Sequence, residues 1–312
     1  MRATGGRVSN VTPLVSVVIP TYNRATDLKR ALTSVLRQTW QHWEALVVDN
    51  HSTDNTREVL ESFQDRRIRL VSVHNKGVIA ISRNFGVANS TGSYLAFLDS
   101  DDWWTPTKLA DSVQRCEAGA DLVYHDLYLV WSRRQRIYWR RRRTRALSAP
   151  AYDDLILKGN AICNSSVVVR RDVFARIGGF SEDPSLVAWE DYDAWLRIAK
   201  ITERFERLAR PLGYYWIGGG NMTSAERTLR IFPRVRELYF ALQGERCEDR
   251  LPAWYHYGLG LAHYELGSYA LSLQHMRHAL PGPLPVWSRS KALFTLTASS
   301  VRVLVGAKGA QE

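Results

Sequence analysis

The chain has 312 residues, of which 45% are hydrophobic and 23% charged, and its formal net charge is +11. This composition is typical of a soluble globular protein, and the length allows one large domain with an appendage or two domains. No stretch approaches the roughly 18 unbroken apolar residues of a membrane-spanning helix. Residues 1–13 have no apolar core, so we expect a disordered tail there rather than a secretory signal. Three separated cysteines without a CxxC pair argue against a disulfide framework or a zinc knuckle, and they favour the reducing cytoplasm.

Short β-branched runs alternate with helical patterns over the first hundred residues. Strands are predicted at 15–20, 44–49, 68–73 and 94–98, and helices after a capping Asp27, at 53–63 and at 77–89. This alternation predicts βαβ units and a parallel sheet. Ligands of such sheets bind beyond the carboxyl ends of the strands. The candidate binding segments are therefore those that follow the first, second and fourth strands, namely 21–24, 49–52 and 99–102.

The rest of the chain changes character at about Thr223. Before it we predict a helix opening at Thr105, strands joined by a turn over 121–137, a strand at 166–170 and a helix at 190–199. Beyond it strand signals fade, which predicts a domain over 14–222 and a helical region over 223–312. Within that region, residues 257–270 resemble one tetratricopeptide unit. One unit cannot bury its own face, so we expect it to dock on the preceding domain, although a plain helical hairpin fits the pattern as well.

A dense basic run lies in the middle of the chain. Eight arginines fall within residues 133–145, and no acid lies among them. Such a block attracts polyanions: nucleic acid, anionic lipid headgroups or phosphorylated substrates. The neighbouring Trp131, Tyr138 and Trp139 favour an anionic membrane surface, where aromatic rings lie beside basic residues, and make nucleic acid the less favoured partner. A solvated hairpin that only keeps the chain soluble is the alternative.

An Asp-x-Asp motif, Asp99 and Asp101, directly follows an apolar strand. Carboxylates in such a place are costly unless they are paired or bound to a metal. Two hard oxygen ligands on one short loop suit Mg²⁺ or Mn²⁺, which would also hold a diphosphate and neutralise the charge that builds on it. The alternative is that these acids only cap the helix that begins near Thr105.

Six segments together resemble family 2 glycosyltransferases, which have the GT-A fold, a Rossmann-like mixed α/β sheet. In chain order they are 15–24, 48–54, 75–86, 97–103, 178–180 and 190–197. Each is modest alone, but the set covers roughly residues 14–221 in the order of the family. The resemblance implies an inverting, metal-dependent, hexosyltransferase-type enzyme. It would move a sugar from a UDP-, GDP- or dTDP-sugar to a saccharide or lipid-linked acceptor, and a helical region would follow the GT-A domain.

The resemblance assigns most of the motifs to the donor. The donor-binding residues that it implies are Pro20, Tyr22, Asp49, Asn50, Arg83, Asp99, Ser100 and Asp101. The first four would line the pocket for the base and ribose, and Arg83 would lie on the donor side. Asp101, with Asp99, would bind the Mn²⁺ or Mg²⁺ ion.

The resemblance makes Asp191 the base that deprotonates the acceptor hydroxyl, with Glu190, Trp189 and Asn221 in supporting positions. From the residues alone, like charges and aromatic walls would raise the pKa of Asp191, whereas a helix N-terminus would lower it. These acids could also serve only to complement the helix dipole.

Two departures from the family leave details open. Asn50 stands where the family usually has a second Asp, so the preferred base of the donor is undetermined. Trp216 and Ile217 occupy the stretch where many relatives have a histidine before the glycines at 218–220.

Two other classes of function compete with the enzyme. A nucleotidyltransferase would need a glycine- and Arg/Lys-rich phosphate loop after its first strand, which 20–23 lacks. The remaining rival is a scaffold that binds nucleic acid or membrane through the basic run at 133–145. We expect the enzyme in the cytoplasm, with peripheral contact to the cytoplasmic face of the membrane.

Overall fold

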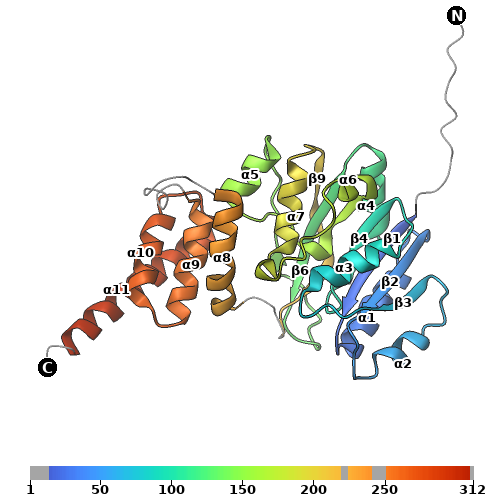
Figure 1. The fold of residues 1–312 in the computed structure, drawn as a ribbon, viewed down its shortest axis with the longest axis horizontal. Helices are drawn as coiled ribbons and strands as arrows, with labels where there is room; N and C mark the ends of the chain where they lie inside the picture. The colour runs from blue at the N-terminus through green and yellow to red at the C-terminus, as the bar shows by residue number, and fades with distance from the viewer. Residues whose placement is uncertain (1–13, 219–223, 241–250, 310–312) are drawn as a thin grey trace, which may run out of the picture.

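The computed structural model describes residues 14–218, 224–240 and 251–309, with side chains of the last helix described as far as residue 304. The expected tail at 1–13 lies outside the described residues. Within these ranges the N-terminal part is an α/β unit, and four helices stand beside it (Figure 1).

The centre of the α/β unit is a mixed sheet of nine strands in the order β3-β2-β1-β4-β8-β6-β9-β5, with β7 paired to β6. Its strands are β1 (Val15–Thr21), β2 (Trp43–Asp49), β3 (Ile68–Ser72), β4 (Tyr94–Phe97), β5 (Trp103–Trp104), β6 (Leu122–Val130), β7 (Arg141–Arg142), β8 (Val168–Arg170) and β9 (Phe205–Trp216). The strands β1 to β4 are mutually parallel, as the sequence predicts. The sheet as a whole is mixed because β8 runs antiparallel to both β4 and β6.

Helices cover both faces of this sheet and continue beyond it. They are α1 (Ala25–Leu36), α2 (Thr56–Glu61), α3 (Ile79–Ala88), α4 (Lys108–Glu117), α5 (Ala151–Lys158), α6 (Arg171–Arg176), α7 (Glu190–Ala199), α8 (Ala225–Phe240), α9 (Ala253–Glu265), α10 (Tyr269–Ala279) and α11 (Val286–Gly309), with 3₁₀ turns η1 (Asn164–Ser166) and η2 (Pro184–Leu186). One hydrophobic cluster joins α3, α5, α6 and α7 to the sheet, and a second lies under α1 and α4.

Strand β1 shows why the sheet is buried on both sides. Successive side chains of a strand point to opposite faces. Val17 and Ile19 accordingly pack in the cluster under α1, whereas Val18 packs in the cluster under α3, and all three are fully buried. Helix α3 lies so close to the sheet that a Cβ on Gly86 would come within 2.6 Å of a Val18 methyl carbon. Burial on both faces therefore explains the nearly continuous apolar run of β1.

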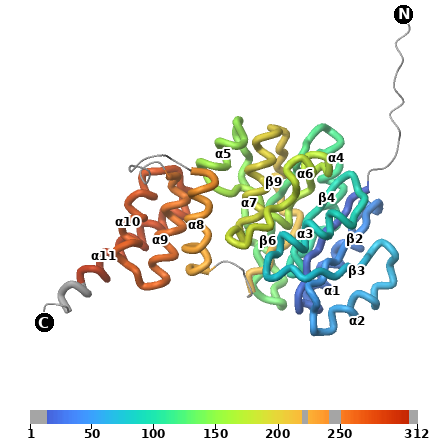
Figure 2. The backbone as a smooth tube through the Cα atoms, in the orientation of Figure 1, coloured from blue at the N-terminus to red at the C-terminus, as the bar shows by residue number. Residues whose placement is uncertain are grey.

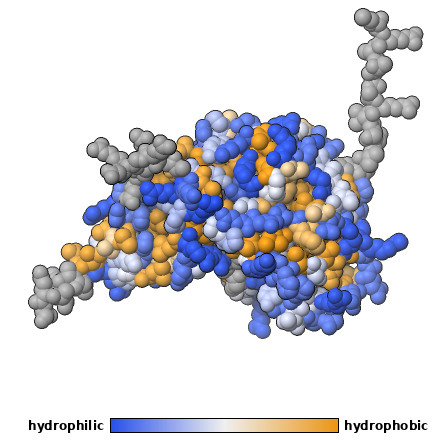
Figure 3. Space-filling model, viewed as in Figure 1, coloured by the Kyte–Doolittle hydropathy of each residue, from blue (hydrophilic) through white to orange (hydrophobic). Residues whose placement is uncertain are grey.

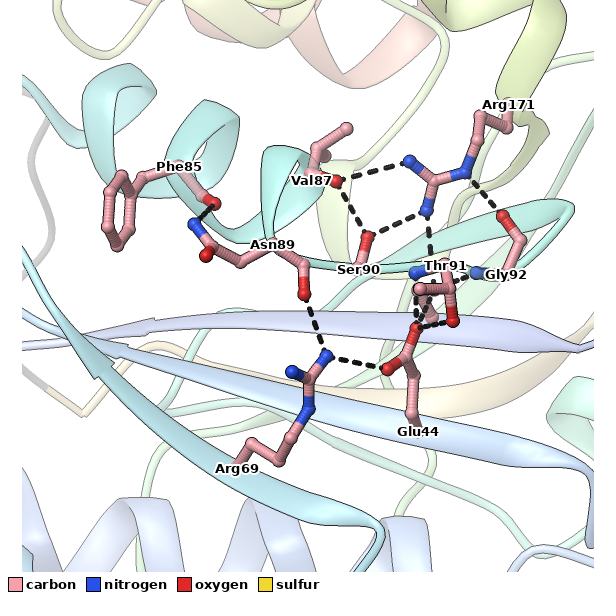
Figure 4. A network of polar contacts seen from close by, with 10 residues as sticks. Glu44, Arg69, Phe85, Val87, Asn89, Ser90, Thr91, Gly92 and Arg171 are labelled. Carbon is pink, nitrogen blue, oxygen red and sulfur yellow. Dashed lines mark hydrogen bonds and ion pairs between the residues drawn. The ribbon is translucent and has the colours of Figure 1, made fainter.

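A polar network joins the amino-terminal edge of the sheet to the ends of α3 and α6 (Figure 4). Glu44, on β2, accepts hydrogen bonds from the Thr91 N–H (2.6 Å) and the Ser16 hydroxyl (2.8 Å) and pairs with Arg69 (2.8 Å). Arg171 donates to the Gly92 and Val87 carbonyls and to the Ser90 hydroxyl. Burial acts to raise the pKa of Glu44, but the hydrogen bonds outweigh it and the pKa is lowered. The network therefore stabilises the charged carboxylate at the edge opposite the candidate site.

The structure differs from the predicted elements in several places; β5, α5 and α6 were not predicted, and α4 begins at Lys108 rather than at Thr105. Asp27 does not cap α1, because the helix begins at Ala25; the carboxylate lies in the first turn and pairs with Arg24, Arg30 and Arg133. The segment 121–137 holds one strand, β6, whose hairpin partner is the later β7. The long strand β9 was not predicted, because Pro211 and several charged residues break its alternation, and its pairing with β6 is irregular in register.

The helices α8 to α11 form a bundle beside the α/β unit, with α8, α9 and α10 running side by side (Figure 2). Three polar contacts join the bundle to the α/β unit. The Tyr239 hydroxyl donates to Asp193, Arg234 pairs with Asp183 (3.1 Å), and the Trp254 indole N–H donates to the Ile156 carbonyl (2.9 Å). Helices α9 and α10 span the segment that resembles a tetratricopeptide unit.

The outer side of α11 remains apolar and exposed (Figure 3), with Val286 and Trp287 each at least 80% accessible. Among the described residues, no helix is both long enough and apolar enough to span a bilayer.

Candidate active site

The ends of β1 and β4 and the start of α7 meet at one cleft. Its cavity volume is about 210 Å³. The side chains that line it come from segments up to 196 residues apart, and they are Pro20, Arg24, Ile79, Arg83, Asp99, Ser100, Asp101, Asn164, Ala188, Glu190, Asp191, Tyr215 and Trp216. The cleft thus brings together six residues that the sequence analysis assigned to donor, metal or catalysis, together with Glu190 from the supporting set.

A second hollow of about 300 Å³ shares Pro20, Arg24, Ile79 and Ser100 with the cleft and extends it outward. Its further lining residues are Thr21, Tyr22, Asn50, Asn75, Gly77 and Ser82. The side-chain oxygen of Asn50 accepts the Asn75 N–H (3.0 Å), which ties the ends of β2 and β3 together. Tyr22 is 54% exposed and presents its ring to the hollow.

Asp49, the remaining predicted donor residue, is not among the residues that line either hollow. Its carboxylate accepts hydrogen bonds from the backbone N–H and the hydroxyl of Ser52. It therefore shapes the loop after β2, which also carries Asn50.

Arg83 is the buried centre of the cleft. One guanidinium nitrogen lies 2.7 Å from a carboxylate oxygen of Asp99, and another lies 2.5 Å from one of Glu190. The Asn164 side-chain N–H also donates to Asp99 (3.2 Å). Burial acts to lower the pKa of Arg83, but the two carboxylates outweigh it and the pKa is raised. Arg83 thus holds the loop after β4 and the start of α7 in fixed positions.

The acids after β4 repel one another. Burial, followed by the charge of Asp99, raises the pKa of Asp101 to about 6, although Arg24 lies only 3.1 Å away. Asp102 is buried and accepts the Trp216 N–H (2.9 Å), and burial followed by the charges of Asp101 and Asp99 raises its pKa well above the usual range. A bound cation would relieve this repulsion.

The residues around Asp101 fit a divalent metal that is shared with a phosphate ligand. Asn164 lines the same cleft, and its buried side-chain oxygen accepts no hydrogen bond from the described part of the chain. No group of three or more His, Cys, Asp or Glu side chains among the described residues is placed to hold a metal alone. Mg²⁺ in nucleotide sites typically takes only one or two carboxylates and completes its shell with phosphate and water oxygens. Asp101 and Asp99 supply that number.

Asp191 lies in the first turn of α7, next to Glu190, which pairs with Arg83. Burial, followed by the charge of Glu190, raises the pKa of Asp191 to about 7, against the opposing charge of Arg83. Glu190 also accepts a hydrogen bond from the N–H of Ala188 (2.6 Å). Ala188 has a positive φ of 75°, a backbone conformation that is strained for residues other than glycine. A carboxylate with a pKa near neutrality is suited to accept a proton at physiological pH.

The structure places Trp189 elsewhere than the prediction did. Trp189 is buried and packs against Tyr192 and Tyr239, so it forms part of the wall between α7 and α8 rather than the lining of the cleft. Asn221 lies outside the described residues.

The sequence pattern did not indicate that Asn164 lines the cleft or that Arg142 lies near it. Asn164 comes from η1 and approaches Asp99 through the fold, and the polar run at 164–166 before an apolar strand was its only local signal. Arg142, from the basic run, lies with its guanidinium 5.0 Å above the ring of Tyr215. Its pKa is raised by Cys163 first, and also by Tyr215 and Asp191, so it lies within electrostatic reach of the cleft.

The chain is similar to known glycosyltransferases. A model of glycosyl transferase family 2 matches residues 16–178. The putative teichuronic acid biosynthesis glycosyltransferase TuaG of Bacillus subtilis is 28% identical over 244 residues, which cover 75% of this chain and 92% of the relative.

Two solved structures share the fold. TarS of S. aureus, in complex with UDP-GlcNAc, matches with a TM-score of 0.60 and 15% identity over 95% of this chain and 92% of its own. The mannosyltransferase PcManGT of Pyrobaculum calidifontis, in complex with GDP-Man and Mn²⁺, matches with a TM-score of 0.54 and 18% identity over 97% of this chain and 81% of its own. The chain therefore belongs to glycosyl transferase family 2 and is a glycosyltransferase with a GT-A fold.

Proposed function

We propose that the protein transfers a sugar from a nucleoside diphosphate sugar to an acceptor hydroxyl, with inversion and with help from a divalent metal, in polysaccharide or glycoconjugate biosynthesis. The carrying observation is that Asp191, whose pKa is about 7, lines the same cleft as Asp99 and Asp101. The acceptor class is a saccharide, free or lipid-linked. The name of the relative TuaG supports the biosynthetic setting.

The donor occupies both hollows in this proposal. The base and ribose lie in the outer hollow, against the exposed ring of Tyr22 and beside Pro20 and Asn50. The diphosphate lies at the shared boundary near Ser100, within reach of Asp101. The UDP-GlcNAc bound to TarS and the GDP-Man bound to PcManGT support a nucleotide-sugar donor.

Asp101 and Asp99 would hold the Mn²⁺ or Mg²⁺ ion, which supplies positive charge against the diphosphate of the donor. The Mn²⁺ named with PcManGT supports this ion. Arg24 lies 3.1 Å from Asp101 and keeps part of the acidic charge neutralised when no ion is bound. Arg83 fixes the direction of Asp99 through its 2.7 Å contact.

Asp191 acts as the base. Its carboxylate takes the proton of the acceptor hydroxyl while that oxygen forms a bond to the anomeric carbon and the bond from this carbon to the diphosphate oxygen breaks. The nucleoside diphosphate leaves with the bonding electrons. A single displacement inverts the configuration at the anomeric carbon, which is the proposed stereochemical outcome. Glu190, held by Arg83 and the Ala188 N–H, positions Asp191.

The proposed location is the cytoplasm. The two cysteines whose surroundings are described, Cys116 and Cys163, are both free and buried. Free thiols are typical of proteins in a reducing compartment.

The test is sugar transfer or donor hydrolysis from a panel of UDP-, GDP- and dTDP-sugars, with and without Mn²⁺. Parent protein, Asp191→Asn and a matched control, Asp153→Asn, are compared; Asp153 is an exposed acid on α5. We expect metal-dependent turnover with at least one donor, a fall in Asp191→Asn and no change in the control. Full activity of Asp191→Asn would refute the assigned base, and full activity after chelation would refute the metal.

A further inference from the structure

The arginines of the basic run fall into two groups. Arg133 pairs with Asp27 (3.3 Å), and Arg145 pairs with Asp154 and donates to the Gly159 carbonyl, so these two contribute to the fold. The other group forms no ion pair with an acid within the described part of the chain, and its members are Arg134, Arg136, Arg140, Arg141, Arg142 and Arg143. Six arginines in one short segment thus have no acidic partner among the described residues, and all but Arg142, which lies over Tyr215, are free to meet an outside partner.

The segment that carries them, residues 131–143, is an ordered hairpin, which we name the basic hairpin. Gln135 organises its turn: its side-chain oxygen accepts the Trp131 N–H, and its side-chain N–H group donates to the carbonyls of Leu129 and Ile137, all at 3.1 Å. The ring of Tyr138 packs against Tyr214 of β9 with a centroid distance of 4.9 Å. The hairpin therefore has a defined conformation, and its outer side chains are exposed because of that conformation.

Large apolar side chains are exposed on the same hairpin. Ile137 is 75% accessible, Trp139 64% and Trp131 42%. The guanidinium of Arg140 lies 4.7 Å above the ring of Trp139 and 5.9 Å from that of Trp131. Exposed tryptophan beside unpaired arginine is the combination found at the boundary between lipid headgroups and acyl chains.

We propose that the basic hairpin docks the protein on an anionic lipid bilayer. The arginines complement the negative headgroups, and Trp139 and Ile137 enter the interface, where they leave water. A nucleic acid would satisfy the arginines and could stack on Trp139, but it offers Ile137 no apolar surroundings. The exposed aliphatic side chain is what favours the bilayer over nucleic acid.

The hairpin also contacts a residue that lines the active-site cleft. Arg142 lies over Tyr215, which lines the cleft, and the Val130 carbonyl at the base of the hairpin accepts the Ile217 N–H (2.7 Å). A bilayer bound by the hairpin would therefore lie near the mouth of the cleft. Together with the proposed function, on which this step rests, that position favours a lipid-linked acceptor over a freely diffusing one.

The experiment is co-sedimentation of the full chain with phosphatidylcholine vesicles, with and without phosphatidylglycerol, at low and moderate salt. The charge variant is Arg140→Ser with Arg141→Ser and Arg143→Ser, and the apolar variant is Ile137→Ser with Trp139→Ser. A matched charge control removes three exposed arginines elsewhere, Arg57, Arg66 and Arg176, each changed to Ser. All these side chains are exposed, and thermal unfolding checks that every variant folds.

We expect the parent to bind vesicles that contain phosphatidylglycerol and to be released by salt. The charge variant should bind on the order of 100-fold more weakly, because each arginine near an anionic surface contributes about 1 kcal/mol. The apolar variant should also bind more weakly, and the control should bind like the parent. Equal binding by parent and charge variant, or equal losses in the charge variant and the control, would overturn the proposal.

A nucleic-acid partner gives a different outcome. If the parent binds a single-stranded RNA homopolymer at the same salt but does not sediment with anionic vesicles, the bilayer is the wrong partner. Asp191→Asn should sediment like the parent, because vesicle binding does not use the catalytic base. Failure of sugar transfer with intact vesicle binding would thus contradict only the proposed function, and the reverse would contradict only the docking surface.

Discussion

The bridge from Arg83 to Asp99 and Glu190 allows the sharpest test of the site. Arg83→Met keeps much of the side-chain volume but removes the cation, leaving carboxylates that are 29% and 6% exposed without their partner. Breaking a buried pair in this way typically costs about 3–5 kcal/mol. For a domain of this size each kcal/mol lowers Tm by roughly 2–4 °C, so we expect a fall on the order of 10 °C near neutral pH.

The loss of stability in Arg83→Met should depend on pH, and the direction of this dependence follows from the pKa of Asp191. Arg83 opposes the rise in the pKa of Asp191, so Arg83→Met should raise that pKa above its present value of about 7. An acid whose folded pKa is raised above the unfolded value loses stability as pH increases through that interval. The destabilisation added by the raised pKa of Asp191 is therefore present at pH 8 and largely absent at pH 5, so the Tm difference between parent and Arg83→Met should be smaller at pH 5 than at pH 8.

Differential scanning fluorimetry across pH 5 to 8 measures Tm, and the pH profile of sugar transfer reports the pKa of the proposed base, Asp191. The rising limb of the profile should move to higher pH in Arg83→Met. Arg83→Lys should be intermediate, because an ammonium keeps the charge but lacks the planar fork that bridges two carboxylates. The exposed Arg57→Met is the control. A Tm within about 1 °C of the parent, together with an unmoved profile, would refute the bridge; lost donor affinity with an unmoved profile would place Arg83 on the donor instead.

Three further predictions concern other parts of the molecule. Asp101→Ala should abolish the stabilisation by nucleoside diphosphate plus Mn²⁺, which for the parent is about 2.7 kcal/mol at 100-fold over Kd; a thermal shift like that of the parent would remove Asp101 from the metal site. Asp191→Asn should lower the transfer rate by roughly 10²- to 10⁴-fold with donor affinity retained, as measured by initial rates and titration; an equal loss of affinity would move Asp191 into the donor pocket. Glu44→Gln tests the network of Figure 4. The pKa of Glu44 is lowered in the folded protein, so its stabilising contribution is present above the unfolded pKa of about 4.3 and is lost as pH falls through the folded pKa. Acid titration of Glu44→Gln should therefore show lower stability at pH 7 and a shallower decline below pH 5; parallel curves for parent and variant would contradict this.

The sequence by itself determined the parallel half of the sheet and the acids that follow it. The strands β1 to β4 are apolar runs bounded by turns, and their pattern depends only on neighbours in the chain. Asp99 and Asp101 follow one such run, so their place at the carboxyl edge could be predicted. The resemblance to the family, whose motifs occur here in the same order, further indicated Asp191 as the base.

The tertiary structure alone decided which of these groups meet. Arg83 and Glu190 lie 107 residues apart, and nothing local to either residue indicates the other. Asn164 reaches Asp99 from a turn whose position no local pattern indicates, and Trp189 faces α8 rather than the cleft. Strand β9 escaped prediction because Pro211 and its charged residues break the alternation, and only pairing with β6 and β5 makes it a strand. Local patterns reflect contacts between near neighbours in the chain, whereas ion pairs, cleft walls and strand partners depend on distances that exist only once the sheet has assembled.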